Sequence, residues 1–308
     1  MARAVVFGGT GMVGRNLLRS RMSANFDVLA PSRSEVDCED QTQVLDYLLA
    51  HEPSFVVNCA GLVGGIKENS RNQANFLLRN LSIGKNILLA ATNLREVSVL
   101  NISSSCMYST TAPQPFKESD ICGGPFEPTN EGYALAKYSI CKLGEYLSNT
   151  NSNVSIKTVI PCNLYGLFDN FDLERGHLIA SAMLRLYKAA VEKDDHVDIW
   201  GSGKPKREFM YCADLADAIW FLLGKFDELP MYLNVGSGDE YSVVEYYEII
   251  KRVMGISVEI RPTHDGLDGM SRKIMDSSTV RRLGWNPDTN IYDGIAKTYK
   301  YFLERVHV

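Results

Sequence analysis

Hydrophobic positions in the first half of the chain fall into short apolar runs separated by longer amphipathic stretches. The apolar runs predict strands at residues 4–7, 27–30, 55–58, 97–102 and 156–160. The stretches between them have helical spacing, at residues 12–20, 41–50, 72–93 and 133–148. Strands that alternate with helices predict a parallel sheet with helices on both faces. The fold class is therefore α/β, a Rossmann-type doubly wound sheet.

The second half of the chain breaks this alternation. Turn signals interrupt it at Asp169-Asn170, Gly201-Ser202-Gly203 and Gly236-Ser237-Gly238. We expect a Rossmann domain over residues 1–161 and a smaller C-terminal α/β substrate lobe over residues 162–308. No Pro/Gly-rich linker separates the two, and we expect residues 211–223 to pack back on the first domain.

A glycine-rich turn follows the first strand. It reads Gly8-Gly9-Thr10-Gly11-Met12-Val13-Gly14 and leads into a helical pattern. Glycines at this spacing permit a tight turn, a close approach of backbone to a pyrophosphate, and close packing of helix on strand. The pyrophosphate would lie at the positive end of the helix. This context predicts a dinucleotide site, and the alternative is an ordinary glycine-rich turn.

The residues after the second strand bear on which dinucleotide binds. Pro31-Ser32-Arg33 lacks the acidic residue that would bind the ribose 2′-hydroxyl of NAD. The Arg33 guanidinium can instead bind a 2′-phosphate, which favours NADP. The alternative is a solvated surface arginine.

Tyr133 and Lys137 begin the helical stretch 133–148. The i,i+4 spacing places phenol and ammonium on one helix face. We expect the nearby lysine to lower the pKa of the tyrosine, which suits proton transfer to a reduced carbonyl. Without other signals, the pair would be interpreted as an ordinary surface pair. The glycine turn strengthens the interpretation that it is catalytic.

The fourth predicted strand runs into Ser103-Ser104-Ser105-Cys106. If the chain stays extended, Ser104 and Cys106 point to the same side. The hydroxyl could then donate to a substrate carbonyl, and the thiol could act as an acid or base. The alternative for Cys106 is a small buried hydrophobic residue.

Composition narrows the class of protein. The 308 residues are 45% hydrophobic and carry a formal net charge of -5, and no basic tract points to nucleic acid. The seven cysteines are dispersed without zinc spacing, which predicts free thiols, no metal and a reducing compartment. A strand begins almost at the N-terminus, and no apolar run reaches membrane-spanning length. We expect a cytoplasmic protein with no membrane partner.

These residues together resemble the extended short-chain dehydrogenase/reductase superfamily, and more closely the GDP-L-fucose synthase family. The resemblance extends over nearly the whole chain. Its segments are residues 62–66 (LVGGI), 104–108 (SSCMY), 130–137 (NEGYALAK), 161–166 (PCNLYG), 200–203 (WGSG), 207–209 (REF) and 268–273 (DGMSRK).

The resemblance implies NADPH-dependent 3,5-epimerisation and 4-keto reduction of GDP-4-keto-6-deoxy-D-mannose to GDP-L-fucose by a homodimer. Reduction would use Ser104, Tyr133 and Lys137, and proton exchange at C3 and C5 would use Cys106 and His177. On pattern alone, His177 only opens the amphipathic run 178–190. The residues implied to line NADP include some of these catalytic residues. They are Gly8, Gly9, Thr10, Gly11, Met12, Val13, Gly14, Arg33, Ile102, Ser103, Ser104, Ser105, Lys137, Pro161, Cys162, Asn163, Leu164 and His177. Those implied to hold the GDP-sugar are Arg185, Trp200, Arg207 and Asp268.

Two other functions stay open. The first is C4 reduction, with one epimerisation or none, of a related GDP-4-keto-sugar such as a 6-deoxyheptose or colitose precursor. The pair Cys106 and His177 argues against a pure reductase. The second is a non-catalytic NADP-binding regulator, which the intact Ser104, Tyr133 and Lys137 disfavour.

Overall fold

The computed structural model describes residues 1–121, 123–263 and 268–306. Within these residues the largest sheet has six strands, all paired in parallel, in the order β2-β1-β3-β4-β5-β9. The strands are β1 (Arg3–Phe7), β2 (Asp27–Leu29), β3 (Phe55–Asn58), β4 (Val97–Ile102), β5 (Val154–Pro161) and β9 (Tyr232–Val235). The strand order reverses between β1 and β3, which is where open α/β sheets bind ligands beyond the strands' carboxyl ends.

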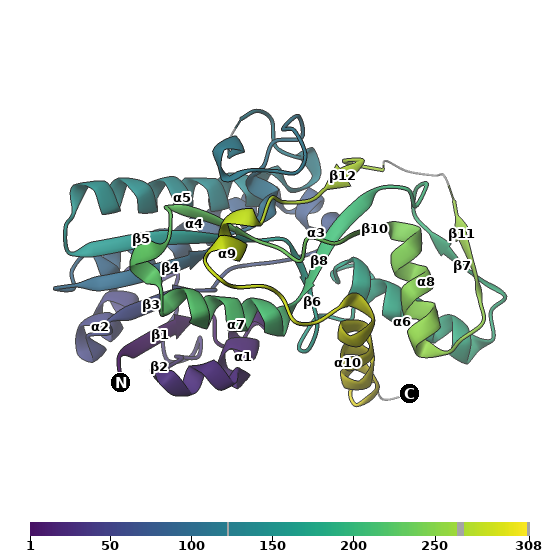
Figure 1. Cartoon of the computed structure of the whole chain (residues 1–308), viewed down its shortest axis with the longest axis horizontal. Helices are drawn as coiled ribbons and strands as arrows, with labels where there is room; N and C mark the ends of the chain where they lie inside the picture. Colours follow the sequence, from purple (N-terminus) through teal and green to yellow (C-terminus); the bar gives the residue numbers. More distant parts are fainter. Residues whose placement is uncertain (122, 264–267, 307–308) are drawn as a thin grey trace.

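Helices cover both faces of this sheet (Figure 1). One face carries α2 (Gln41–His51), α4 (Gln73–Ala91) and α5 (Glu131–Thr150), and α4 packs on both of the others. The other face carries α1 (Met12–Arg19) and α7 (Cys212–Leu223), which pack on each other. The predicted Rossmann-type doubly wound fold is confirmed.

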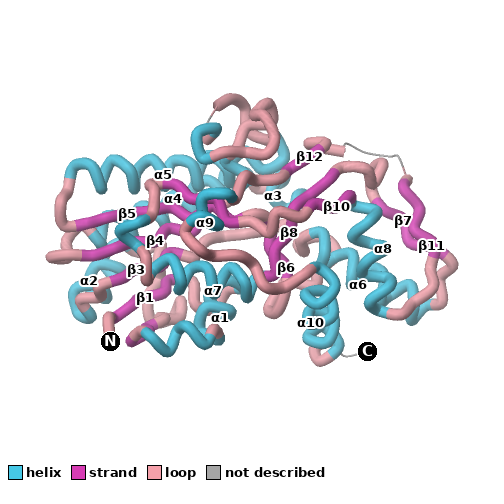
Figure 2. The backbone as a smooth tube through the Cα atoms, in the orientation of Figure 1, coloured by secondary structure: helices cyan, strands magenta, loops and turns pink. Residues whose placement is uncertain are grey.

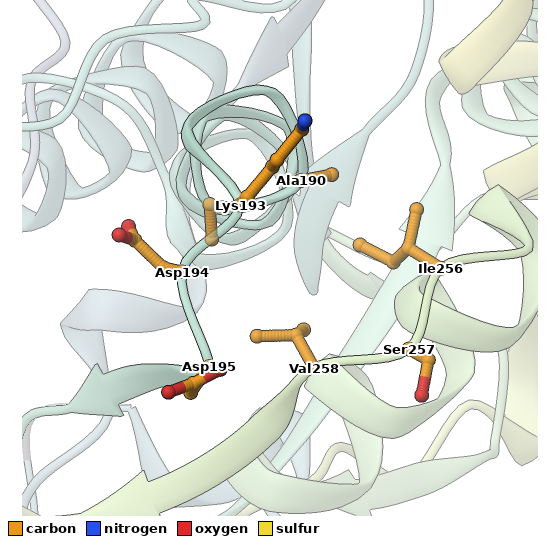
Figure 3. Close-up of a pocket in the computed structure, with 8 residues that line it drawn as sticks. Ala190, Lys193, Asp194, Asp195, Ile256, Ser257 and Val258 are labelled. Atoms are coloured by element: carbon orange, nitrogen blue, oxygen red, sulfur yellow. The ribbon is translucent and has the colours of Figure 1, made fainter.

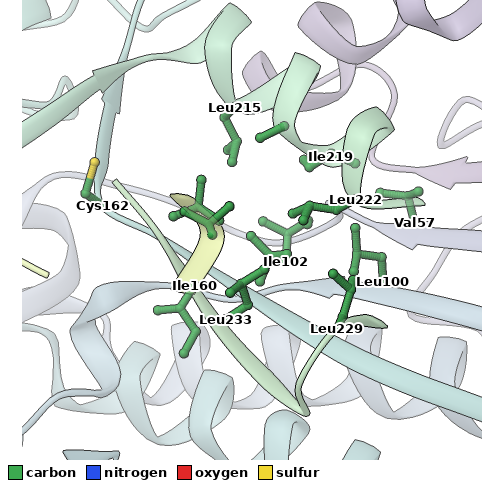
Figure 4. Packing of buried hydrophobic residues seen from close by; sticks show 14 of the residues in the cluster. Val57, Leu100, Ile102, Ile160, Cys162, Leu215, Ile219, Leu222, Leu229 and Leu233 are labelled. Atoms are coloured by element: carbon green, nitrogen blue, oxygen red, sulfur yellow. The ribbon is translucent and has the colours of Figure 1, made fainter. Parts of the chain in front are cut away.

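The pleat of β4 explains why its residues form a continuous apolar run. Val97 and Val99 pack with the core on the α2–α4–α5 face. Leu100 and Ile102 pack with the core on the α1–α7 face, where Figure 4 shows them facing Ile219 and Leu222 of α7. A strand buried on both faces needs apolar residues at odd and even positions alike.

Segments from the second half of the chain complete this sheet. Strand β9 is its edge strand beside β5. Helix α7 is anchored to α1, because the Trp220 indole N–H donates to the Leu17 carbonyl at 3.0 Å and its ring stacks on Phe26. The chain therefore passes between the two parts of the molecule more than once.

The remaining elements form a second, smaller α/β unit (Figure 2). One sheet joins β6 (Asn163–Tyr165), β8 (Lys206–Tyr211), β10 (Glu240–Ser242) and β12 (Arg272–Lys273), and β7 (His196–Ile199) pairs with β11 (Glu259–Pro262). The helices here are α6 (Leu178–Glu192), α8 (Val243–Met254) and α10 (Ile291–Leu303). They share a core rich in aromatic residues, including Phe209, Tyr246 and Phe302. Two short helices, α3 (Ile66–Arg71) and α9 (Ser278–Arg282), lie outside this core.

Candidate active site

The glycine turn forms a close-packed cradle between β1 and α1. Gly8 has a φ of +84°, and Gly11 donates to its carbonyl at 3.0 Å. A Cβ at Gly8 would lie 2.6 Å from the backbone nitrogen of Ala60, and a Cβ at Gly14 would lie 2.2 Å from the Gly8 carbonyl oxygen. Side chains are therefore excluded where a dinucleotide diphosphate would approach the backbone, and the turn fits that ligand.

Arg33 lies four residues beyond β2 with its side chain 66% exposed. Its guanidinium contacts Glu39 at 3.2 Å and Asp37 at 3.5 Å. Glu39 also accepts from Arg79 at 2.7 Å. Arg33 is thus held by a local network of charges in this structure.

Lys137 lies beneath the carboxyl end of β4. Its ammonium donates to the Ile102 carbonyl at 3.1 Å and lies 5.8 Å from the centre of the Tyr133 ring. Burial lowers the pKa of Lys137, and the thiols of Cys141, Cys106 and Cys59 oppose this. Helical i,i+4 spacing thus brings the two side chains together.

The predicted decrease in the Tyr133 pKa is wrong for this structure. Burial raises the pKa of the phenol, Cys106 raises it further, and a hydrogen bond with Ser104 opposes the increase. Removing a phenol from water penalises its charged form. At neutral pH Tyr133 is therefore a phenol with a proton to donate.

The chain does not stay extended from Ser104 to Cys106, which was the condition for strand alternation to place both on one side. A 3₁₀ turn, η2 (Ser105–Met107), follows β4, and Ser104 caps it. The Ser104 hydroxyl accepts from the backbone N–H of Cys106 at 3.3 Å. Serine favours such a cap, because its oxygen satisfies a free N–H at the start of the turn. The cap, and not strand alternation, keeps the hydroxyl and the thiol together.

Cys106 is buried, with 5% of its surface exposed. Burial raises the pKa of its thiol, whereas Lys273, the Ser104 hydrogen bond and Lys137 lower it. Ser104 therefore contacts both Tyr133 and Cys106, and two lysines lie near the thiol. The geometry gathers Ser104, Cys106, Tyr133 and Lys137 into one cluster at the end of β4.

The loop after β3 lies along this cluster. Asn80 of α4 accepts from the Leu62 N–H at 2.9 Å and donates to the Leu62 carbonyl at 3.0 Å. A Cβ at Gly61 would lie 2.8 Å from the Asn80 side-chain oxygen and 3.7 Å from the Lys137 ammonium. Asn80, which the sequence analysis did not single out, fixes the loop that borders Lys137.

His177 occupies the N-cap position of α6 in an extended conformation, and its side chain makes no capping hydrogen bond. The loop before it contacts the loop after β3, since the Gly65 N–H donates to the Arg175 carbonyl at 3.0 Å. Burial lowers the pKa of His177, so its imidazole is neutral at pH 7. One loop thus borders Lys137 at Gly61 and the His177 segment at Gly65.

The predicted cofactor residues after β4 and β5 lie on adjacent strands. Residues 102–105 follow β4, and residues 161–164 span the end of β5 and the start of β6, with β5 paired beside β4. The Asn163 side chain donates to the Glu208 carbonyl at 2.8 Å and so ties this segment to β8. Both segments lie at the carboxyl edge of the sheet, next to Ser104.

Arg207 on β8 and Asp268 before β12 lie close together in the smaller unit. Burial lowers the pKa of Arg207, while Glu127 and Asp268 oppose this. The Asp268 carboxylate accepts from the backbone N–H of Ser202 at 2.8 Å and from its hydroxyl at 2.6 Å. Asp268 therefore holds the turn that follows Trp200.

Trp200 and Arg185 lie farther out on the smaller unit. Trp200 is 70% exposed, and the Lys67 ammonium lies 4.9 Å from the centre of its ring. Arg185 on α6 lies near Tyr247 of α8, whose pKa burial raises and Arg185 lowers. The structure does not group these two with the cluster at the end of β4.

Lys273 is a candidate site residue that sequence reasoning missed. It pairs with Arg207 across β12 and β8. Burial lowers its pKa, Cys106 raises it, and Arg207 lowers it further. A lysine that lies near an arginine and a thiol has the environment of an anion site. The sequence could have pointed to Lys273 because it lies in the charged segment 268–273. The neighbouring residues, however, do not predict that a lysine there is buried.

Other features of the molecule fall outside this site. Among the described residues no group of three or more His, Cys, Asp or Glu is arranged to hold a metal ion. In the same part of the chain, the helices all fall short of the length and apolarity needed to cross a membrane. A surface hollow of about 460 Å³ at the end of α6 is lined by Lys193, Asp194 and Val258, among others, and by none of the site residues above (Figure 3).

Comparison with known proteins shows which family this chain belongs to. The model of the NAD dependent epimerase/dehydratase family matches residues 4–236. The chain belongs to that family. A GDP-L-fucose synthase of Azorhizobium caulinodans is 39% identical over 98% of this chain and 96% of its own. A GDP-L-colitose synthase of Yersinia pseudotuberculosis is 38% identical over 98% of both chains. The resemblance seen in the sequence is confirmed.

Solved structures agree with the fold of this family member. A GDP-6-OMe-4-keto-L-xylo-heptose reductase from Campylobacter jejuni has a TM-score of 0.90 at 24% identity, over 99% of this chain and 98% of that one. A GDP-mannoheptose C4 reductase from the same organism, with NADP bound, has a TM-score of 0.86 at 25% identity over 98% of both chains.

Proposed function

We propose that this protein converts GDP-4-keto-6-deoxy-D-mannose to GDP-L-fucose by NADPH-dependent 3,5-epimerisation and 4-keto reduction. One observation carries the proposal: the Ser104 hydroxyl accepts from the backbone N–H of Cys106 and lies beside the Tyr133 phenol. A reductase needs the serine, tyrosine and lysine alone, whereas epimerisation next to a ketone also needs a proton-exchanging group beside the same sugar ring, and Cys106 stands there. Relatives named GDP-L-fucose synthase, 33–39% identical to this chain, support it.

The residues present fit NADP. The cradle from Gly8 to Gly14 would hold the diphosphate at the N-terminus of α1, and Arg33 would bind the 2′-phosphate. Residues 102–105, Lys137, 161–164 and His177 would line the rest of the cofactor. When bound, NADPH supplies the hydride for C4.

Three residues would act on the C4 carbonyl. The Ser104 hydroxyl would donate a hydrogen bond to the ketone oxygen. The Tyr133 phenol, held protonated by burial, would give its proton to that oxygen during reduction. The Lys137 ammonium, fixed by the Ile102 carbonyl, would stabilise the phenolate that forms.

Cys106 and His177 would exchange the protons on C3 and C5, because the C4 ketone acidifies both C–H bonds. In this structure the pair begins as a thiol and a neutral imidazole. One group can accept a proton as the other donates one, and the pair keeps its net charge. Lys273 and Lys137 stabilise the thiolate state of Cys106.

The GDP-sugar would be held by the smaller unit. Arg207 and Lys273 offer adjacent cations for the diphosphate. Arg185 would add a further charge, Trp200 offers an exposed aromatic face for the base, and Asp268 holds the turn beside it.

Incubation with GDP-4-keto-6-deoxy-D-mannose and NADPH, followed by NMR of the product, tests the proposal. We expect the L-galacto configuration, with both C3 and C5 inverted. A product reduced at C4 but unchanged at C3 and C5 would replace it with simple C4 reduction.

A second candidate function is C4 reduction of a related GDP-4-keto-sugar with one epimerisation or none. The 38% identity to a GDP-L-colitose synthase supports this second candidate function. A 3-deoxy sugar carries no hydroxyl at C3, so inversion there has no meaning and C5 is the one neighbouring carbon whose configuration can change. Competition between the two 4-keto-sugars, read as relative kcat/KM, separates the candidates. The catalytic cluster argues against a non-catalytic NADP-binding regulator.

We also propose a homodimer assembled through α4 and α5, in the cytoplasm. The support is the exposed apolar side chains on these packed helices, Leu78 on α4 and Tyr146 on α5. The division into residues 1–161 and 162–308 is part of the same proposal, with β9 and α7 returning to the first part. Light scattering of wild type and Leu78→Lys tests the dimer, since a monomeric variant is expected.

A further inference from the structure

Glu208 is a buried carboxylate in the strand that carries Arg207. Its side chain has no exposed surface, whereas that of Arg207 is partly exposed. Neighbouring residues of a strand point to opposite faces, so Glu208 lies behind the face on which Arg207 stands. Burying a carboxylate costs free energy unless hydrogen bonds replace those it made with water.

Its two oxygens bind two different segments of the chain. One accepts from the Gly238 N–H at 2.8 Å, and the other accepts from the Met275 N–H at 2.9 Å. A Cβ at Gly236 would lie 2.2 Å from the first oxygen, so the β9–β10 loop approaches closely because a glycine stands there. Glu208 therefore joins β8 to the β9–β10 loop and to the segment after β12.

The second bond matters for Lys273, which lies two residues before Met275. Strand β12 has two residues, and Lys273 is the one paired with Arg207. So short a strand contributes few ladder bonds, and side chains help to fix the segment alongside the backbone bonds that Phe116 makes with Ile274 and Asp276. Gln114 holds the next residue, Ile274, from one side, and Glu208 holds Met275 from the other.

The charges around Glu208 make it sensitive to pH. Burial raises its pKa to about 7, the two N–H groups and Arg281 of α9 lower it, and Asp239 of the β9–β10 loop raises it. Cys162 and Tyr246 also lie near it, and Glu208 raises the pKa of each. In the ionised carboxylate both oxygens are strong hydrogen-bond acceptors for the two N–H groups. In the protonated acid one of these oxygens is a hydroxyl, which accepts a hydrogen bond only weakly.

We propose that Glu208 is a positioning residue for the substrate diphosphate, holding Lys273 beside Arg207 so that the two cations face one anion. The inference rests on the proposed GDP-sugar function. Glu208 acts through Lys273 and itself touches no ligand.

The test is the Kd of GDP, measured by calorimetry from pH 6 to pH 8.5 on the full chain. At pH 8 we expect Glu208→Gln to weaken GDP binding by about 10-fold, from the loss of a charge-assisted hydrogen bond. The NADP Kd should stay within twofold. Wild-type affinity should fall relative to Glu208→Gln as pH drops through 7, a comparison in which the ligand's own titration cancels. Glu259→Gln, which breaks an exposed pair with Arg261, is the matched control and should bind GDP as wild type does.

A double-mutant cycle separates positioning from general stability. In a Lys273→Met background, Glu208→Gln should weaken GDP binding by less than twofold, because the group it positions is gone. An undiminished 10-fold loss there, or a Glu208→Gln variant that binds NADP and GDP like wild type, would overturn the role of Glu208 alone. Failure of wild type to bind GDP would overturn the diphosphate site and the proposed function with it.

Discussion

The hydroxyl of Ser104 accepts a hydrogen bond from the backbone N–H of Cys106 at 3.3 Å, at the point where β4 ends in a 3₁₀ turn. The same hydroxyl lies beside the Tyr133 phenol and opposes the rise in its pKa. A side chain suited to polarising a ketone is thereby coupled to both a phenol and a thiol. The proposed reduction at C4 and the proposed proton exchange by Cys106 can therefore act on a sugar bound in one orientation, because Tyr133 and Cys106 both lie beside Ser104.

Cys106→Ser should separate the two activities. A hydroxyl ionises roughly 5 or more pK units less readily than a thiol, so proton exchange should stop while Ser104, Tyr133 and Lys137 remain in place. In D₂O with the keto-sugar and oxidised cofactor, we expect wild type to incorporate deuterium at C3 and C5 and the variant almost none. With NADPH the variant should slowly yield the unepimerised reduced sugar. His177→Asn should weaken exchange too, and absence of deuterium from the wild-type sugar would contradict the epimerase.

Tyr133→Phe and Lys137→Met should each remove most C4 reduction. The phenylalanine has no proton to give, and the methionine cannot bond the Ile102 carbonyl or stabilise a phenolate. We expect a fall in kcat of about 100-fold or more, which is the usual contribution of a general acid. NADPH binding, followed by fluorescence, should remain measurable. Turnover near that of wild type in Tyr133→Phe would remove the tyrosine from the mechanism.

Arg33→Ala should raise the KM for NADPH much more than the KM for NADH. The reason is that a 2′-phosphate would take the guanidinium away from Glu39 and Asp37. Glu39→Gln provides the opposite change, since Arg33 loses a competing carboxylate, and it should leave the KM for NADPH unchanged or lower. Equal effects of Arg33→Ala on both cofactors would show that Arg33 does not meet the 2′-phosphate.

Asp169→Asn should stabilise the protein above pH 7. Burial raises the pKa of Asp169 to about 7, and one of its oxygens is buried without a hydrogen bond. A raised carboxyl pKa means that its contribution to stability is present below about pH 4 and is lost as pH rises through 7. The Tm of the variant should exceed that of wild type at pH 8 by roughly 2–4 °C per kcal/mol recovered. The gain should shrink toward pH 5, and a gain independent of pH would contradict the shift.

The amino-acid sequence by itself determined the elements of the first half and their local chemistry. The strands at 55–58 and 97–102 have the bounds that their apolar runs predict, and the glycine turn begins the helix expected of it. Tyr133 and Lys137 share a face because helical periodicity is a local property. Such features depend on neighbours within a few residues, so they can be read directly from the chain.

Tertiary structure alone decided the features that depend on distant residues. Strand β9 joins the sheet beside β5, and Lys273 is brought to Arg207 from more than 60 positions away. The phenol of Tyr133 has a raised pKa, and not the lowered one expected, because burial and the nearby Cys106 outweigh the opposing effect of Ser104. Burial and long-range pairing are set when the whole chain packs, and spacing along the sequence carries no measure of how much water each group loses.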